Sequence, residues 1–362
     1  MNTFRRNIVH HLVAASLLLG TGSAVVAADA PVGMSAKPDP QMQAVLDQLK
    51  KLGAKPVETL TPQQARVQPT PADAVKAVLK NENKSTEPEP VANVADEKIE
   101  GAAGSIPVRI YTPQGKGPFP VVVYYHGGGW VIADLDTYDA SGRALANAAQ
   151  AIVVSSHYRQ APEHKFPAAH EDALAAYKWV LTNAANFNGD PKRIAVAGES
   201  AGGNLAATVA LQAKQQGLQM PLHQLLIYPI AGNNLNTPSY RNNAGATPLS
   251  KAGMAWFFKN YENSPSEGDS ELISLVDKAD LKGLPPATII TAQIDPLMSD
   301  GKKLADKLKQ AGVAVTYMNY EGVTHEFFGM APVVDKAKDA QQLAGKSLRE
   351  AFSNGGKRVG SN

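Results

Sequence analysis

Two glycine-framed segments hold the residues whose types and spacing could do chemistry. One is His126-Gly127-Gly128-Gly129-Trp130, and the other, about seventy residues further along, is Gly198-Glu199-Ser200-Ala201-Gly202-Gly203. Each segment directly follows an apolar run that is typical of a β-strand. A serine hydroxyl attacks at neutral pH only with a base to take its proton and donors to hold the developing oxyanion. Together the segments predict a nucleophile and an oxyanion hole for acyl transfer.

Ser200 is the predicted nucleophile. It lies between the apolar run 193–197 and the helix-prone stretch 204–211, which predicts a strand, a sharp turn and a helix. Gly198 and Gly202 flank it at two positions on either side, as in a nucleophile elbow, where strand and helix approach closely. Such an elbow sets the serine at a helix N-terminus, where the amide of the next residue is free to donate to an oxyanion. A glycine-rich turn with a merely capping serine shares this local pattern, so the interpretation depends on the other segment.

Gly127 and Gly128 are predicted oxyanion donors together with Ala201. Consecutive glycines after the strand-like run 120–125 expose backbone amides without side chains in the way. A phosphate-binding loop is the alternative, but the Lys-Ser/Thr ending of a P-loop and the spacing of a dinucleotide fingerprint are both missing. His126 is a candidate base, although bracing this turn by hydrogen bonds fits its place better.

The acid and the base are predicted from chain order. An α/β-hydrolase supplies its triad in the order Ser, then Asp or Glu, then His, each on the loop after a strand. Of the two histidines after Ser200, His223 begins an apolar run, whereas His325 follows the run 313–318 and a turn. His325 is therefore the predicted base. Asp295 also follows a strand-like run and is the predicted acid, which would accept Nδ1–H of His325 and leave Nε2 free for the serine.

Two further acidic residues lie close to these positions. Asp300 competes for the role of triad acid, but it lies where residues 301–310 become helical and fits a helix start better. Glu326 directly follows His325 and is expected to be an exposed residue without a role.

On these motifs the chain resembles the hormone-sensitive-lipase-like branch of the α/β-hydrolases, a group of bacterial esterases and lipases. Besides the two glycine segments, the resemblance is carried by Tyr158-Arg159-Gln160-Ala161-Pro162-Glu163-His164, Asp295-Pro296-Leu297 and His325-Glu326-Phe327-Phe328. It implies ester hydrolysis through an acyl-enzyme and no cofactor. The residues that it implies are the triad Ser200, Asp295 and His325 and the oxyanion donors Gly127, Gly128 and Ala201.

Some residues depart from that family's pattern or extend it. Glu199 stands where one subgroup usually has aspartate, and Gln160 stands where leucine is frequent. Arg159, Glu163 and Asp172 are interpreted as ion-pairing or hydrogen-bonding groups that hold loops near the site.

Composition limits the partners and cofactors. The formal net charge is +2, from 35 basic and 33 acidic residues. Removing Arg5 and Arg6 with a signal peptide leaves 33 of each, so nucleic acid and anionic membranes are not expected partners. Because the chain has no cysteine, it has no disulfide, lipid-attachment site or cysteine-bound zinc. The histidines show no metal-ligand spacing, so no metal is expected.

The first 28 residues read as a cleavable signal peptide, with a basic start, an apolar stretch at 12–19 and small residues before a cut after Ala28. Export by the general pathway fits better than a twin-arginine signal, and the apolar stretch is too short for a retained membrane anchor. The expected location is the periplasm or the medium. The sequence leaves the oligomeric state open.

The remaining chain is expected to adopt an α/β-hydrolase fold, a mostly parallel sheet flanked by helices, with a small helical cap. An N-terminal cap segment is expected at 29–94, the catalytic domain at 95–356 and a tail at 357–362, with a second cap segment at about 231–284. Strands are expected at 107–111, 120–125, 151–157, 193–198, 223–229, 287–292 and 313–319, and helices at 168–184, 201–215, 299–311 and 333–352. An aromatic helix near 249–261 could be a lid over the serine or ordinary core.

The expected activity is hydrolysis of small, short-chain, uncharged esters. A non-catalytic small-molecule-binding protein on the same fold is one alternative, and it tends to lack a triad member. An amidase or deacetylase with the same triad is the other, and the pocket rather than the fold would distinguish it.

Overall fold

The computed structural model describes Met1 and residues 36–358. Apart from Met1, the expected signal peptide over 1–28 lies outside the described residues, as do residues 29–35 of the expected cap segment and most of the expected tail. Within the described part of the chain, no helix is long and apolar enough to cross a membrane.

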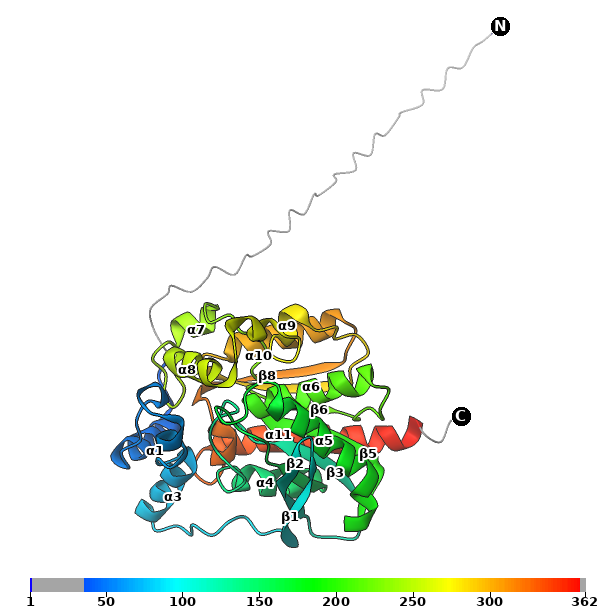
Figure 1. Cartoon of the computed structure of the whole chain (residues 1–362), viewed down its shortest axis with the longest axis horizontal. Coiled ribbons are helices and arrows are strands. Elements are labelled where there is room, and N and C mark those ends of the chain that lie inside the picture. Colours follow the sequence, from blue (N-terminus) through cyan, green and yellow to red (C-terminus); the bar gives the residue numbers. More distant parts are fainter. Residues whose placement is uncertain (2–35, 359–362) are drawn as a thin grey trace. The chain divides into compact units, whose positions relative to one another are not determined.

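An eight-stranded sheet forms the centre of the fold (Figure 1), in the order β1-β2-β4-β3-β5-β6-β7-β8. β1 pairs antiparallel with β2, β2 pairs antiparallel with β4, and all other neighbours are parallel. The strands are β1 (Asn93–Gly101), β2 (Gly104–Thr112), β3 (Phe119–Tyr125), β4 (Ile152–Ser156), β5 (Gly189–Glu199), β6 (Gln224–Ile227), β7 (Ala287–Ile294) and β8 (Val315–Thr324). The expected mostly parallel α/β sheet is confirmed.

Helices cover both faces of the sheet because successive strand residues point to opposite sides. Along β3, Val121 and Val123 join one buried cluster, whereas Val122 and Tyr124 join the other. The first cluster includes apolar residues of α5 (Ala168–Asn183), α6 (Ala201–Gln215) and α10 (Met298–Gln310). The second includes those of α4 (Asp139–Ala149) and α11 (Asp335–Arg358).

The expected strands and helices are all present, with ends shifted by a few residues. β1 and α4 were not predicted. β1 lies at the sheet edge with most of its residues exposed or half-buried, so its sequence lacks the apolar run of a central strand. α4 has no side-chain N-cap, and its left-handed C-cap is Gln150 where glycine is the usual residue, so neither end carries a clear sequence signal.

Six short helices lie in the two expected cap segments. The first segment holds α1 (Pro40–Lys51), α2 (Pro62–Arg66) and α3 (Pro71–Asn81), and the second holds α7 (Pro238–Asn242), α8 (Lys251–Tyr261) and α9 (Leu275–Lys278). α1, α2 and α3 each begin with proline after a residue whose side chain accepts a hydrogen bond from the first turn: Asp39, Thr61 and Thr70. Short 3₁₀ turns span Val57–Thr59, Ala184–Phe187, Pro265–Asp269 and Phe327–Met330.

The two cap segments contact each other as well as the sheet. Trp256 Nε1 of α8 donates to the carbonyl of Leu60 at 3.1 Å, and Ser250 Oγ donates to Glu58 at 3.0 Å. Met42 of α1 is fully buried in the same cluster as Phe328, which follows β8. The first segment is therefore fixed to the second and to the loop after β8.

The contact between α4 and α11 gives a test of the core. A Cβ added at Gly345 of α11 would overlap Ala148, including its backbone. We expect Gly345→Ala to lower the free energy of unfolding by about 1–3 kcal/mol, because the helices must move apart. Thermal or urea unfolding would measure this. Gly245→Ala is the control, since nothing lies within 4 Å of its added Cβ; equal effects of the two variants would contradict the packing argument.

Candidate active site

The structure brings the three predicted triad side chains together. Ser200 Oγ lies 2.9 Å from Nε2 of His325, and Nδ1 of His325 lies 2.7 Å from Oδ2 of Asp295. All three residues are buried, and Asp295 is completely so. The other oxygen of Asp295 accepts a hydrogen bond from the amide of Leu297 at 2.8 Å. With Nδ1–H donated to Asp295, Nε2 is free to accept the hydroxyl proton of Ser200.

Each triad residue lies at or just beyond the carboxyl end of a parallel strand: Ser200 after β5, Asp295 after β7 and His325 after β8. Because parallel strands end at one edge of the sheet, residues 125 positions apart in sequence meet there. Asn243 of the second cap segment donates to the carbonyl of Asp295 at 3.1 Å, which helps to fix that loop.

Ser200 has φ +56° and ψ −118°, a conformation that costs about 1–3 kcal/mol for a residue with a side chain. Its amide donates to Ile227 at 2.9 Å and its carbonyl accepts from Ile230, so the turn is tied to the end of β6. A Cβ at Gly202 would overlap the carbonyl of Tyr125, so only glycine lets α6 approach β3 this closely. These contacts hold the serine in its strained conformation.

The three predicted oxyanion donors lie in two segments that contact each other: an added Cβ at Gly127 would come 3.1 Å from the carbonyl of Glu199, beside the serine. Ala201 is the first residue of α6, so its amide has no partner within the helix. Within the described residues, the amides of Gly127 and Gly128 donate no backbone hydrogen bond outside regular elements. Both could therefore point to an oxyanion, and Gly128 lies in the same cavity as Ser200.

His126 braces the glycine loop and does not contact the serine. Its Nδ1 lies 2.8 Å from the carbonyl of Gly127 and its Nε2 lies 2.9 Å from Nδ1 of His157. Burial, together with the charge of His157, lowers the pKa of His126 to about 3. The ring therefore stays neutral and serves as a hydrogen-bonding strut.

Glu199, beside the nucleophile, is buried, and it forms no ion pair with a Lys, Arg or His side chain of residues 36–358. The hydroxyls of Tyr124 and Tyr228 donate to its two carboxylate oxygens, the first at 2.7 Å. Burial, with the charge of Glu326, raises the pKa of Glu199 to about 7, although the hydrogen bonds oppose this shift. The Tyr228 ring also packs against His325, with 4.5 Å between ring centres.

Glu326 corrects the expectation of simple exposure. Its side chain is only 20% exposed, and its Oε1 lies 3.6 Å from Nε2 of His325. The hydroxyl of Tyr138 lies 2.7 Å from each of its oxygens. Burial raises the pKa of Glu326, while His325 and Tyr138 oppose the rise.

Asp300, the competing candidate for the triad acid, lies in the first turn of α10. Its carboxylate accepts hydrogen bonds from the amides of Ala231 and Gly232.

A cavity of about 610 Å³ opens onto the triad, within the usual range for small-molecule sites. Its apolar lining comes mainly from the cap segments: Leu46, Leu49, Val57, Leu249, Met254 and Phe257. The aromatic helix α8 thus has both suggested roles, because Phe257 lines the cavity while also belonging to the buried core. Trp130, at the end of the glycine segment, does not line this cavity: it is fully buried and stacks on Tyr261, with 4.4 Å between ring centres.

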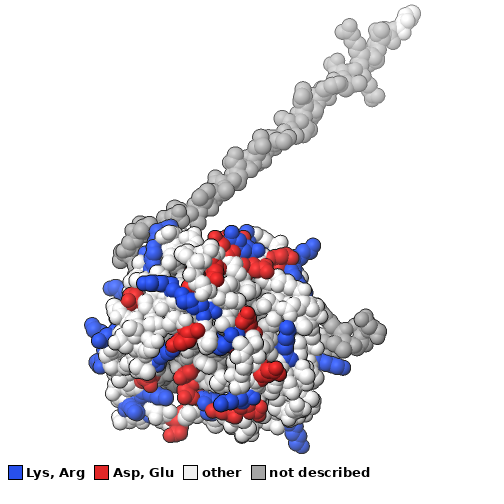
Figure 2. Space-filling view, viewed as in Figure 1, with Lys and Arg blue, Asp and Glu red and all other residues white. Residues whose placement is uncertain are grey.

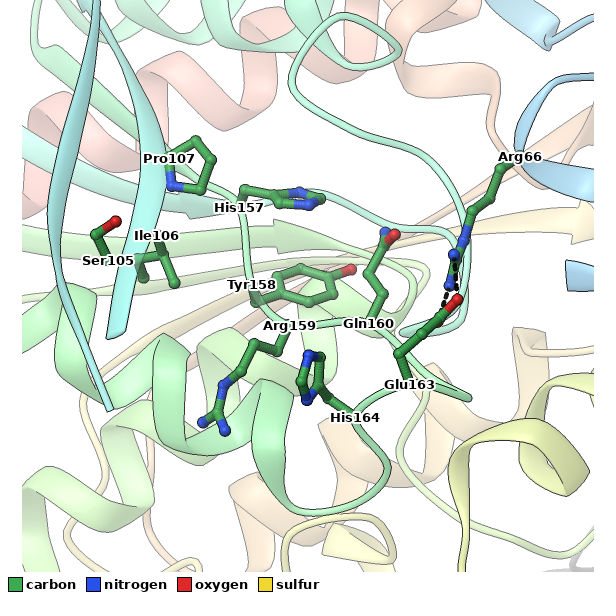
Figure 3. Close-up of a pocket in the computed structure, with 10 residues that line it drawn as sticks. All are labelled: Arg66, Ser105, Ile106, Pro107, His157, Tyr158, Arg159, Gln160, Glu163 and His164. Atoms are coloured by element: carbon green, nitrogen blue, oxygen red, sulfur yellow. Dashed lines mark hydrogen bonds and ion pairs between the residues drawn. The ribbon is translucent and has the colours of Figure 1, made fainter. Parts of the chain in front are cut away.

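Arg66 of α2 clamps the first cap segment to the glycine loop. It donates to the carbonyls of Val131 and Ala161 at 2.8 and 2.7 Å, and its two terminal nitrogens reach the carboxylate of Glu163. Figure 3 shows this ion pair at one side of a second cavity of about 390 Å³, which His157 also lines. The second cavity does not include Ser200, so it is not where the triad acts.

The segment after β4 holds loops as expected. Arg159 pairs with Asp172 at 2.8 Å and Glu171 at 3.0 Å, and Gln160 donates to the carbonyls of Ile132 and Ala133 at 2.8 Å. Sequence reasoning missed Arg66 and Tyr138, since no local pattern links them to partners 97 and 188 positions away. For Glu326, the sequence did offer a signal of a place in the site, because this residue directly follows the predicted base His325.

Figure 2 shows Lys and Arg side chains interspersed with Asp and Glu on the face that it draws. Within the described residues, no group of three or more His, Cys, Asp or Glu is arranged to hold a metal ion.

Comparisons with known proteins agree with this geometry. The sequence model of a family described by its alpha/beta hydrolase fold matches residues 122–329. The chain belongs to the α/β-hydrolases, in the hormone-sensitive-lipase-like branch, and is a serine ester hydrolase.

Several named esterases are similar to this chain. It is 44% identical over 255 residues to Carboxylesterase NlhH of Mycobacterium tuberculosis, covering 68% of this chain and 79% of that one. It is 31% identical over 299 residues to an ethyl acetate hydrolase of Pseudomonas putida, covering 82% and 92%. The solved hyperthermophilic esterase of the archaeon Pyrobaculum calidifontis matches with a TM-score of 0.77 and 38% identity, over 87% of this chain and 98% of that one.

The pKa of His325 predicts the acid side of the pH profile. Burial lowers this pKa, but the charge and hydrogen bond of Asp295, with the charges of Glu326 and Glu199, outweigh it and raise the pKa. A protonated His325 cannot accept a proton, so we expect kcat/KM to fall as pH drops through a value above the ordinary one of about 6.5. Asp295→Asn should move that limb to lower pH. Circular dichroism over the same range would exclude unfolding, and an unshifted limb in the variant would contradict the assignment.

The Arg66 clamp predicts that the cap segment matters for activity. We expect Arg66→Ala to lower kcat/KM on a short-chain ester about tenfold, because α2 would no longer hold the backbone beside the oxyanion glycines. Arg66→Lys should recover little, since an ammonium cannot make the same forked contacts. Lys51→Ala, an exposed change at the end of α1, is the control. Full recovery by lysine would show that only the charge matters.

Proposed function

We propose that the protein hydrolyses small, uncharged carboxylic esters with short acyl chains through an acyl-enzyme on Ser200. The observation that supports this best is the continuous hydrogen-bonded line from Ser200 Oγ through His325 to Asp295, with distances of 2.9 and 2.7 Å. Such a line supplies a nucleophile, a general base and an orienting carboxylate at one place.

In the first half of the reaction, Ser200 Oγ would attack the ester carbonyl as His325 Nε2 takes its proton. The amides of Gly127, Gly128 and Ala201 would hold the oxyanion, aided by the N-terminus of α6. The imidazolium would then give its proton to the departing alcohol. In the second half, water would attack the acyl group and Ser200 would leave with a proton from His325.

The cavity supports a small, largely uncharged substrate. Its lining is apolar over much of the surface nearest the cap, which suits an acyl or aryl group. The carboxylate of Glu326 beside His325 would repel an anionic substrate at the reacting centre. The similar Pseudomonas putida protein is named for ethyl acetate, a small neutral ester.

A series of p-nitrophenyl esters of increasing acyl length tests this function. We expect the highest kcat/KM at short chains and a loss of about 10⁴-fold or more in Ser200→Ala, because that variant has no nucleophile. Ser353→Ala, an exposed change on α11, is the control serine outside the triad. Stoichiometric labelling of Ser200 by a serine-directed phosphonate should accompany the activity.

Other results would redirect the proposal. A rate that peaks at long chains would indicate a lipase-like acyl channel. Labelling of Ser200 without turnover of any ester would favour an amidase or deacetylase, and the absence of both would favour a binding protein. Ester hydrolysis that survives in Ser200→Ala would refute the acyl-enzyme on this residue.

A further inference from the structure

A second carboxylate faces the reacting atoms of the triad. Glu326 lines the same cavity as Ser200 and His325. Its Oε1 is 3.6 Å from His325 Nε2, the nitrogen that lies 2.9 Å from Ser200 Oγ. Carboxylate, imidazole and hydroxyl therefore border one small space. Asp295 already satisfies the other side of the imidazole, so Glu326 is not needed to orient the ring.

Glu326 has unused capacity to accept hydrogen bonds. An ionised carboxylate offers about four acceptor positions. Within the described residues, one hydrogen-bond donor reaches Glu326, the hydroxyl of Tyr138, which has a single proton to give. Burial of a carboxylate is unfavourable unless further donors reach it. The remaining acceptor positions lie beside the cavity, where water or substrate can donate to them.

The backbone at this position also indicates a role. Glu326 has φ +70°, in the left-handed region that favours glycine. For a half-buried glutamate, both the left-handed backbone conformation and the partial burial of the carboxylate charge are unfavourable. Strain of this kind collects at functional sites, where surrounding contacts enforce it.

We propose that Glu326 positions the hydrolytic water that deacylates Ser200. Two acceptors 3.6 Å apart can both lie within about 2.7–3.2 Å of one water oxygen. The water would donate one O–H to His325 Nε2 and the other to Glu326. These two hydrogen bonds turn a lone pair of the water oxygen toward the acyl carbon. This inference rests on the acyl-enzyme mechanism proposed above.

The step balances without a proton on Glu326. The water oxygen bonds to the acyl carbon, and His325 Nε2 takes the proton that this oxygen releases. The tetrahedral intermediate then breaks its bond to Ser200 Oγ, which receives that proton from His325, and a carboxylic acid leaves. Glu326 only accepts a hydrogen bond throughout, so it is a positioning residue with respect to proton transfer.

Water positioning differs in its consequences from a general charge effect. The charges of Asp295, Glu199 and Glu326 all act on His325, and Tyr138 also faces Glu326. A change in the basicity of His325 alters acylation and deacylation alike, because both use Nε2. An oriented water matters only to deacylation. An alcohol acceptor such as methanol has one O–H, which goes to His325, so its attack does not need Glu326.

Two variants separate these effects. Glu326→Asp keeps the charge but withdraws the carboxylate by one methylene, and aspartate tolerates the left-handed region. Glu326→Gly removes the side chain where the backbone already suits glycine, so folding is preserved. Asp47→Glu is the matched control, because Asp47 is an exposed carboxylate of α1 that lines the same cavity and is likewise moved by one methylene.

The experiment follows p-nitrophenyl acetate in a stopped-flow instrument and, with added methanol, the ratio of methyl acetate to acetate formed. We expect both Glu326 variants to keep the initial p-nitrophenol release within about twofold while steady-state turnover falls about ten- to a hundredfold. A burst of one product per active site would then appear, and the methyl acetate ratio would rise by a similar factor. Asp47→Glu should leave that ratio unchanged.

Other outcomes would overturn the inference. If initial release and steady-state turnover fall together with an unchanged methanol ratio, Glu326 acts through charge or folding alone. If nothing changes, it has no part in the reaction. Failure of the acyl-enzyme mechanism itself is seen separately, since a serine-directed phosphonate would then leave Ser200 of the wild-type protein unlabelled.

Discussion

The structure depends on one constrained residue, Ser200, held at φ +56° between β5 and α6. The turn can be this sharp only because Gly202 lets the start of α6 press against β3. The same turn leaves the amide of Ala201 unpaired and aims the serine side chain away from the sheet. Nucleophile and one oxyanion donor thus arise from a single local geometry, and the other site residues are arranged around it.

The sequence predicts the triad because each member follows a strand that is recognisable in the sequence as an apolar run. Parallel strands end at one edge, so Ser200, Asp295 and His325 converge without any long-range signal being read. The central strands β3, β4 and β5 are buried on both faces and show continuous apolar runs. The edge strand β1 has no such run, since solvent satisfies most of its side chains, and it was missed for that reason.

Residues that act through distant partners could not be predicted in this way. Arg66 lies on a five-residue helix, and its forked contacts reach Glu163 and two backbone carbonyls of the catalytic domain. Tyr138 precedes an unpredicted helix and meets Glu326 only after folding. Periodicity and capping describe neighbours along the chain, whereas these contacts depend on how two elements pack. The lining of the cavity, supplied largely by the cap segments, is hidden for the same reason.

The electrostatics of the site depend on which side chains donate hydrogen bonds to its carboxylates. Asp295, Glu199 and Glu326 all bear on His325, and together they outweigh the effect of burial on its pKa. An arginine beside Glu199 or Glu326 would have satisfied the carboxylate but would also have cancelled its field at the imidazole. Tyrosine hydroxyls donate hydrogen bonds without adding positive charge, and both glutamates accept such bonds: Glu199 from Tyr124 and Tyr228, and Glu326 from Tyr138. Arg66 and Arg159 pair instead with Glu163 and Asp172. The site is thus able to stabilise the imidazolium that forms whenever His325 takes a proton, because the nearby negative charge is hydrogen-bonded but not neutralised.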